Sequence, residues 1–367
     1  MRPIGLFLLL SLAGGQAAPQ TPESFEDLSA KAQQAYEANR PEEAADLYGR
    51  AVKLRPDWAQ GWWAIGMIEY ERDRYPECTD ALTRMVKLDA SAAPGWALLG
   101  LCEFRTRQYD ASFEHLKKAH MLVPVTQPGG PLLDMADYHL SLLLTRQGAF
   151  EVAQELLMRV ARKVHNNPDM MFAAGLPSLR MSILPSDVPA NERDVVSMAG
   201  KALWDLATQR PEVAEADFKA LVSKYPKFPN VHYFYGTYLA ARHPGQCSPE
   251  FLQELGITPD SIPARVELAL RYTLDGKLDA ALKFAREAVD LSPDSVGAHL
   301  ALAKVLRTQG NNEGALKAYL AAERIDPVSP SIRLQLVNAY RALGRIEEMQ
   351  REKAEYDRLK NEQANWP

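Results

Sequence analysis

The sequence predicts an all-α fold, an α-solenoid of stacked antiparallel helix pairs with about 8–9 repeats. Its main support is a period of 34 residues that occurs in both halves of the chain. A period of about 20–50 residues indicates units that each bury an apolar face only against their neighbours. Small residues and prolines carry the period in three series: Ala44, Cys78 and Ser112; Pro56, Ala90 and Pro124; Gly276, Gly310 and Gly344.

Residues 1–17 are expected to be a signal peptide. Arg2 provides a positive charge at the start, residues 4–12 form a short apolar run, and small residues precede a cleavage site after Ala17. The apolar run is about half as long as a membrane-spanning helix requires. We therefore expect a periplasmic or secreted protein with no membrane span after signal removal. The sequence has no Asn-x-Ser/Thr sequon, which favours bacterial export.

Composition excludes one class of partner. The 367 residues are 47% hydrophobic and 24% charged with a net charge of -5, as in an ordinary folded protein. Because no block of Lys and Arg stands out, nucleic acid is not an expected partner.

The three cysteines leave two interpretations open. A disulfide between Cys78 and Cys102 is compatible with an oxidising compartment. The interpretation favoured here treats Cys78, Cys102 and Cys247 as three small buried hydrophobic residues.

The clearest repeat unit spans residues 264–293. Apolar residues from Val266 to Tyr272 form the stripes of a first helix. Gly276 then suits the left-handed backbone with which helices often end. A second apolar run begins at Leu278, and Pro293 ends it because proline lacks an amide hydrogen and its ring clashes with the preceding turn. The predicted order is helix, tight turn, helix and stop.

Small residues recur where the two helices of one unit should lie closest. Gly66 is expected to face the region of Cys78, and Gly100 the region of Ser112. Helix axes about 8–10 Å apart leave little room there beyond a methyl group. These positions therefore favour close packing within each pair.

The pattern resembles the tetratricopeptide repeat family. Trp62-x-x-Ile65-Gly66 with Tyr70, and Trp96-x-x-Leu99-Gly100 with Phe104, are similar to its first-helix signature. The resemblance covers most of residues 25–360 and implies a stack of helix pairs that binds a peptide or protein in a groove. Units are expected to begin near Phe25, Ala59, Ala93, Asp134, Val195, Pro229, Ile262, Val296 and Pro330.

One segment does not follow the period. Residues 166–194 contain prolines that argue against a long helix, and apolar residues that argue against a free linker. We therefore expect an N-terminal stack over residues 18–165 and an irregular Pro- and Met-rich joint over 166–194. A C-terminal stack over 195–367 should end in a polar capping helix near residues 346–359.

No catalytic motif is found in the sequence. It has no Gly-x-Ser-x-Gly, no phosphate-binding Gly-rich loop, no Cys-x-x-Cys and no His-Glu-x-x-His. We therefore expect no enzymatic activity, no cofactor and no metal site.

The resemblance also implies which residues line the groove. In tetratricopeptide proteins these occupy set positions on the first helix of each unit. An alternative is that some of them belong to the core, because helical repeats have two buried stripes. The residues that match here are Tyr36, Trp63, Met67, Tyr70, Leu101, Phe104, Arg105, Tyr138 and Arg146.

The same positions in the C-terminal half are less apolar. They include Lys304, Arg307, Asn338 and Arg341, which suit a polar or acidic partner. Taken together, the sequence predicts an exported, non-catalytic scaffold that holds an extended peptide or a partner helix. The alternative is a structural subunit of an envelope complex that associates with itself as a homo-oligomer.

Overall fold

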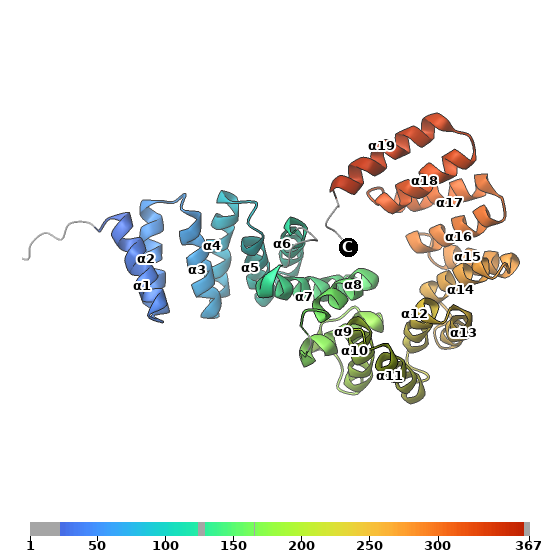
Figure 1. Cartoon of the computed structure of the whole chain (residues 1–367), viewed down its shortest axis with the longest axis horizontal. Coiled ribbons are helices and arrows are strands. Elements are labelled where there is room, and N and C mark those ends of the chain that lie inside the picture. Colours follow the sequence, from blue (N-terminus) through green and yellow to red (C-terminus); the bar gives the residue numbers. More distant parts are fainter. Residues whose placement is uncertain (1–22, 124–128, 165, 363–367) are drawn as a thin grey trace, which may run out of the picture. The chain divides into compact units, whose positions relative to one another are not determined.

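The computed structural model describes residues 23–123, 129–164 and 166–362, so the expected signal peptide lies outside the described residues. In these ranges the chain forms nineteen α-helices and two short 3-10 helices, with no strand (Figure 1). None of the described helices combines the length and apolarity that crossing a membrane requires. The predicted all-α fold is confirmed.

The chain divides into two compact units, the first ending at Leu88 and the second beginning at Asp89. The first unit holds α1 (Phe25–Glu37), α2 (Pro41–Leu54), α3 (Ala59–Glu71) and α4 (Tyr75–Leu88). The second unit holds α5 (Ala93–Arg105), α6 (Tyr109–Leu122), α7 (Gly130–Arg146), α8 (Phe150–Ala161), α9 (Pro168–Ser178), η1 (Pro185–Asp187), α10 (Arg193–Ala207), α11 (Pro211–Lys224), α12 (Val231–Arg242), η2 (Pro244–Gln246), α13 (Cys247–Ile257), α14 (Ile262–Leu274), α15 (Leu278–Leu291), α16 (Val296–Thr308), α17 (Asn312–Ile325), α18 (Pro330–Ala342) and α19 (Ile346–Glu362).

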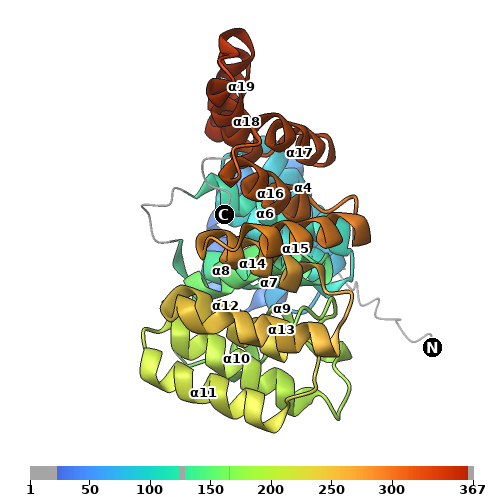
Figure 2. The same ribbon diagram turned by 90° about the vertical axis from the view of Figure 1, so that its right-hand side faces the viewer.

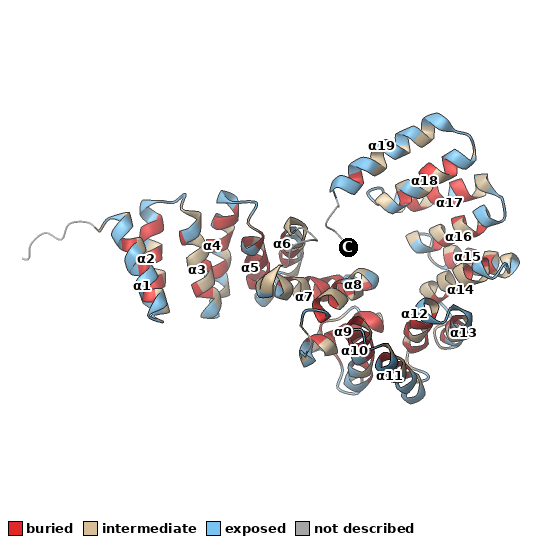
Figure 3. Cartoon of the chain, in the orientation of Figure 1, coloured by how far each residue is buried: buried red, intermediate tan, exposed pale blue. Residues whose placement is uncertain are grey.

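The helix pairs follow the predicted repeat. Six first helices begin at the predicted residue, and the first helices near Asp134, Val195 and Pro229 begin within four residues of it. Each first helix contacts the second helix of the same repeat. In the second compact unit, the pairs from α10/α11 to α14/α15 are stacked in chain order (Figure 2). Buried residues gather on the faces that paired helices turn toward each other (Figure 3).

Glycines allow the two helices of a pair to pack closely. A Cβ added to Gly66 of α3 would lie 2.6 Å from Leu82 Cγ of α4, and one added to Gly100 of α5 would lie 2.6 Å from Leu116 Cγ of α6. Real Cβ atoms do not approach so closely. The space beside each glycine is therefore filled by a leucine of the second helix.

A recurring hydrogen bond ties first helices to the chain that precedes them. Its donor lies in the first turn or so of a first helix, and its acceptor is the backbone carbonyl six residues earlier. Such carbonyls follow a helix end, where no intrahelical partner is available. The bonds run from Trp62 to Pro56 (2.8 Å), Trp96 to Ala90 (2.9 Å), His232 to Pro226 (3.0 Å), His299 to Pro293 (2.8 Å) and Arg333 to Pro327 (3.0 Å).

The joint is more regular than the sequence suggests. It contains α9, whose Pro177 lies close to the helix end, and the short helix η1 before α10. Gly175 and Gly200 let α9 and α10 touch through their backbones, since a Cβ on Gly200 would lie 1.9 Å from the Met171 carbonyl oxygen. Residues of the joint share one apolar core with α8 and with α10 to α14. The apolar packing therefore continues through residues 166–194.

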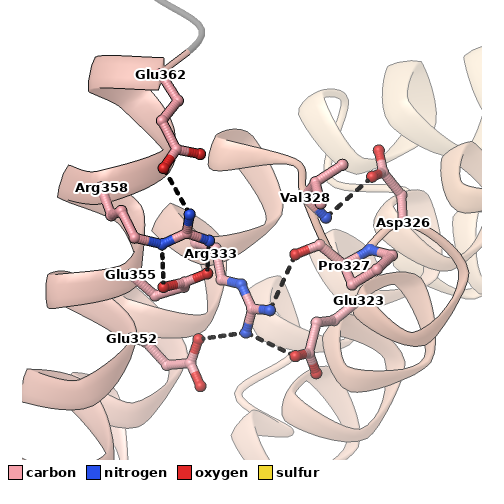
Figure 4. Close-up of polar contacts among 9 residues, drawn as sticks. All are labelled: Glu323, Asp326, Pro327, Val328, Arg333, Glu352, Glu355, Arg358 and Glu362. Atoms are coloured by element: carbon pink, nitrogen blue, oxygen red, sulfur yellow. Dashed lines mark hydrogen bonds and ion pairs between the residues drawn. The ribbon is translucent and has the colours of Figure 1, made fainter.

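A half-buried arginine links the last three helices, α17, α18 and α19 (Figure 4). The side chain of Arg333 on α18 is 12% exposed and pairs with Glu323 of α17 at 2.6 Å and with Glu352 of α19 at 2.9 Å. Along α19 itself, Arg358 pairs with Glu355 and Glu362. The final helix thus has the polar outer side that a terminal repeat needs.

The cysteines differ in state. Cys78 and Cys102 are disulfide-bonded. Cys247 is a free, buried thiol. The favoured expectation of three buried thiols is therefore wrong for Cys78 and Cys102.

Replacement of Gly66 by alanine tests the close packing in the first unit. We expect Gly66→Ala to lower the free energy of unfolding by about 1–3 kcal/mol, because its methyl group overlaps Leu82. The matched control is Gly49→Ala on α2, where no atom lies within 4 Å of the added Cβ. It should be neutral or stabilising by about 0.5–1 kcal/mol. Urea denaturation of both variants gives the comparison, and equal stabilities would contradict the packing argument.

Candidate functional site

In the first unit, four of the predicted residues lie half-buried on first helices. Trp63, Met67 and Tyr70 are spaced by four and three residues on α3, so they share one side of that helix. Tyr36 on α1 donates its hydroxyl hydrogen to Glu71 Oε1 at 3.2 Å. Burial, and then the charge of Glu71, raises the pKa of Tyr36. These residues form an aromatic and apolar face on α1 and α3 that is only partly covered.

In the second unit, an aromatic cluster spans α5, α6 and α7. The Phe104 ring lies edge-on to Tyr109 at 5.4 Å and to His139 at 4.7 Å, and Tyr138 lies edge-on to His139 at 5.1 Å. The guanidinium of Arg146 lies 4.8 Å from the centre of the Tyr109 ring, within range of a cation–π interaction. We call Phe104, Tyr109, Tyr138 and His139 the aromatic cluster.

The remaining predicted residues of this unit have different surroundings. Leu101 is 2% exposed, so the prediction that it lines a surface is wrong and it belongs to the core of the second unit. Arg105 and Arg146 are exposed at the ends of α5 and α7. Tyr138 is half-buried, and burial together with the charge of Asp169 raises its pKa to about 12.

Sequence reasoning missed Tyr109 and His139. Tyr109 is the first residue of a second helix, outside the first-helix positions on which the resemblance depends. His139 follows Tyr138 directly, and its ring contact with Phe104 becomes visible only when α5 and α7 are packed together. Burial, with a smaller effect of Arg105, lowers the pKa of His139 to about 4, although its ring nitrogen Nδ1 bonds the Met135 carbonyl at 2.9 Å. His139 is therefore an uncharged member of the cluster at neutral pH.

The second unit also carries a groove toward the C-terminus, with a volume of about 440 Å³. Three first helices, α14, α16 and α18, form it together with Tyr319 of α17. Its apolar lining consists of Val266, Leu270, Leu300 and Ala301, with Gly297 beside them. Its polar lining consists of Lys304, Arg307, Tyr319, Ser331 and Gln335. We call this the C-terminal groove.

The charges at the C-terminal groove are positive. Lys304 is half-buried and Arg307 is exposed, and both lie near the end of α16. The Tyr319 hydroxyl donates to Gln335 Oε1 at 3.4 Å and also interacts with Arg307. Burial raises the pKa of Tyr319 more than Arg307 lowers it, so this hydroxyl keeps its proton. Asn338 and Arg341, also expected to line this half, bond each other at 3.2 Å and do not line the groove.

A second hollow of about 370 Å³ lies in the first unit, beside α2. It is lined almost wholly by charged side chains, and several of these already pair with one another, such as Arg72 with Glu69 at 3.2 Å. It lacks an apolar floor, so it offers less to a peptide than the C-terminal groove does. Within the described part of the chain, no group of three or more potential metal-ligating side chains is found.

The pKa of His139 gives a test of the aromatic cluster. The unfolded chain takes up a proton near pH 6.5, whereas the folded chain resists protonation until about pH 4. The free energy of unfolding should therefore decrease as the pH falls through this window. Replacement of His139 by phenylalanine should remove this part of the decrease, which urea denaturation at several pH values measures. An identical pH profile in both proteins would contradict the burial of a neutral imidazole.

A comparison with protein-family models finds repeats in both compact units. The tetratricopeptide repeat model matches residues 29–77, within the first unit, and residues 266–330, within the second. No curated protein matches the chain.

The chain also matches solved structures at low sequence identity. A structure titled "Crystal structure of MamA" is 16% identical, with a TM-score of 0.40, over 45% of this chain and 98% of the other. A structure titled "Crystal structure of APC/C hetero-tetramer Cut9-Hcn1" is 15% identical, with a TM-score of 0.34, over 92% of this chain and 73% of the other. The matched segments, residues 29–77 and 266–330, fall on helix pairs with the 34-residue period, so these segments are similar to tetratricopeptide repeats in sequence and in secondary structure.

Proposed function

We propose that this protein is a non-catalytic scaffold that binds a peptide or a helix of a partner protein along its first helices. The observation that supports this most directly is the C-terminal groove, where three successive first helices leave an apolar floor with polar groups beside it. Hollows of this composition are typical of binding sites, because apolar contact supplies affinity and a few polar groups set orientation.

Two further surfaces support a role in protein binding. The face formed by Tyr36, Trp63, Met67 and Tyr70 in the first unit offers half-buried aromatic side chains. The aromatic cluster of the second unit is flanked by Arg105 and Arg146. Trp, Tyr and Arg are the residue types that contribute most to binding energy at protein interfaces. Each surface is proposed as an additional contact site for a partner.

We also propose that the protein is exported to the cell envelope or secreted. The positively charged start, the short apolar run and the small residues before position 18 support this. The disulfide-bonded state of Cys78 and Cys102 adds support, because disulfides persist mainly in oxidising compartments.

Filling the C-terminal groove tests the proposed binding role. Gly297 lines the groove, and an added Cβ would meet nothing closer than 4.0 Å, so Gly297→Phe should occupy the groove without disturbing the core. Peptides selected from a display library against the wild-type protein should bind this variant at least about tenfold more weakly. The matched control is Gly256→Phe on α13, also exposed and also open around its Cβ.

Circular dichroism should show equal helicity in both variants. Unchanged binding by Gly297→Phe would remove the groove from the proposed function. Light scattering of the wild-type protein tests the alternative role, since a mass that rises with concentration would indicate a self-associating structural subunit.

The thiol content tests the proposed compartment. Protein isolated from its native host, denatured without reductant, should show one reactive thiol, that of Cys247. Reduction should raise the number to three, because the sequence has three cysteines. Three reactive thiols before reduction would contradict export to an oxidising compartment.

A further inference from the structure

We propose that the C-terminal groove binds an acidic, extended segment of a partner protein, with an aliphatic side chain as its anchor. This inference rests on the proposed binding role and names the chemistry of the occupant. The carboxylates of the segment would meet Lys304 and Arg307. The aliphatic anchor would lie against Val266, Leu270 and Leu300.

The two cations lie together in the lining of the C-terminal groove. Lys304 and Arg307 are three residues apart on α16, so their side chains are neighbours on one side of the helix. Both line the same groove as the apolar residues of α14 and α16. A ligand that fills the groove therefore contacts both an apolar floor and a pair of positive charges.

Several other basic residues near the groove already pair with carboxylates. Elsewhere in this region, Arg265 pairs with Glu287, Arg333 with Glu323 and Glu352, and Arg345 with Glu313. Lys304 and Arg307 form no ion pair with any carboxylate of the described residues, and the groove lining includes no Asp or Glu. Their charges are therefore left for a ligand to neutralise.

Lys304 interacts electrostatically with Glu267 on α14. Burial raises the pKa of Glu267 because it disfavours the charged carboxylate. The positive charges of Arg271 and Lys304 lower this pKa by a smaller amount. Glu267 also interacts electrostatically with Arg271 on its own helix, so its carboxylate is shared between two positively charged side chains. Glu267 does not line the groove, so an acidic ligand there would meet Lys304 and Arg307 without a carboxylate of the lining beside them.

A purely structural role for the two cations makes a different prediction. Lys304 and Arg307 lie near the C-terminus of α16, where positive side chains stabilise a helix by interacting with its dipole. In that case their removal would lower stability and leave ligand choice unchanged. Binding and stability must therefore be measured on the same variants.

The experiment compares two variants that remove equal charge. One is Lys304→Gln with Arg307→Gln, and the control is Lys317→Gln with Arg324→Gln, both exposed on α17 and outside the groove. The probes are synthetic peptides of equal length that combine a leucine with Asp and Glu, with Lys and Arg, or with Ser and Gln. Binding to the full-length protein is followed by fluorescence anisotropy at low and high salt.

The expected result is preferential binding of the Asp/Glu peptide by the wild-type protein and by the control. The groove variant should bind it about tenfold more weakly, as the loss of a charge-assisted hydrogen bond implies, and its affinity should depend less on salt. Binding of the Ser/Gln peptide should be unchanged by either variant.

Four outcomes would contradict these conclusions. Equal weakening by both variants, or a stability loss without any change in peptide preference, would overturn the inference. A preference for the Lys/Arg peptide would overturn it as well. If no peptide binds and Gly297→Phe also has no effect on any selected ligand, the proposed binding role itself fails, which distinguishes the two conclusions.

Discussion

Close contact between the two helices of each pair is the constraint on which the rest of this structure depends. Gly66 and Gly100 admit Leu82 and Leu116 so closely that even one added methyl group would overlap them. Glycines also allow close packing at Gly175 of α9 and Gly200 of α10, where the backbones of the two helices are in contact. Successive first helices also contact one another, as α14 and α16 do, and the C-terminal groove forms across three of them.

Much of the fold could be predicted because the period is a local property of the sequence. A glycine or proline that ends a helix acts through its own backbone, so first helices begin at or near the predicted residues. The joint was harder to predict. Its prolines indicate irregular structure, but the contact of Gly175 with Gly200 depends on residues 25 positions apart that no short pattern connects.

The candidate site could be predicted only in part. Tyr36, Trp63, Met67 and Tyr70 are half-buried on first helices, as the positions implied, and their binding role stays a prediction. Leu101 is buried because one side of α5 faces other helices of its own unit, which a position within a repeat does not reveal. Lys304 and Arg307 were accessible to sequence reasoning as groove residues. The lack of internal partners became apparent only from their surroundings.

The hydrogen bond to the carbonyl six residues earlier has a consequence for how such proteins diverge. Indole, imidazole and guanidinium groups all make it, at Trp62, His232 and Arg333 among others. Geometry at this site demands only a side chain with an N–H at suitable reach, so selection can exchange tryptophan for chemically unlike residues without loss of the architecture. A consensus sequence includes the tryptophan and leaves out the histidine and arginine that make the same hydrogen bond. Two such chains can therefore share one architecture when their sequences no longer resemble each other.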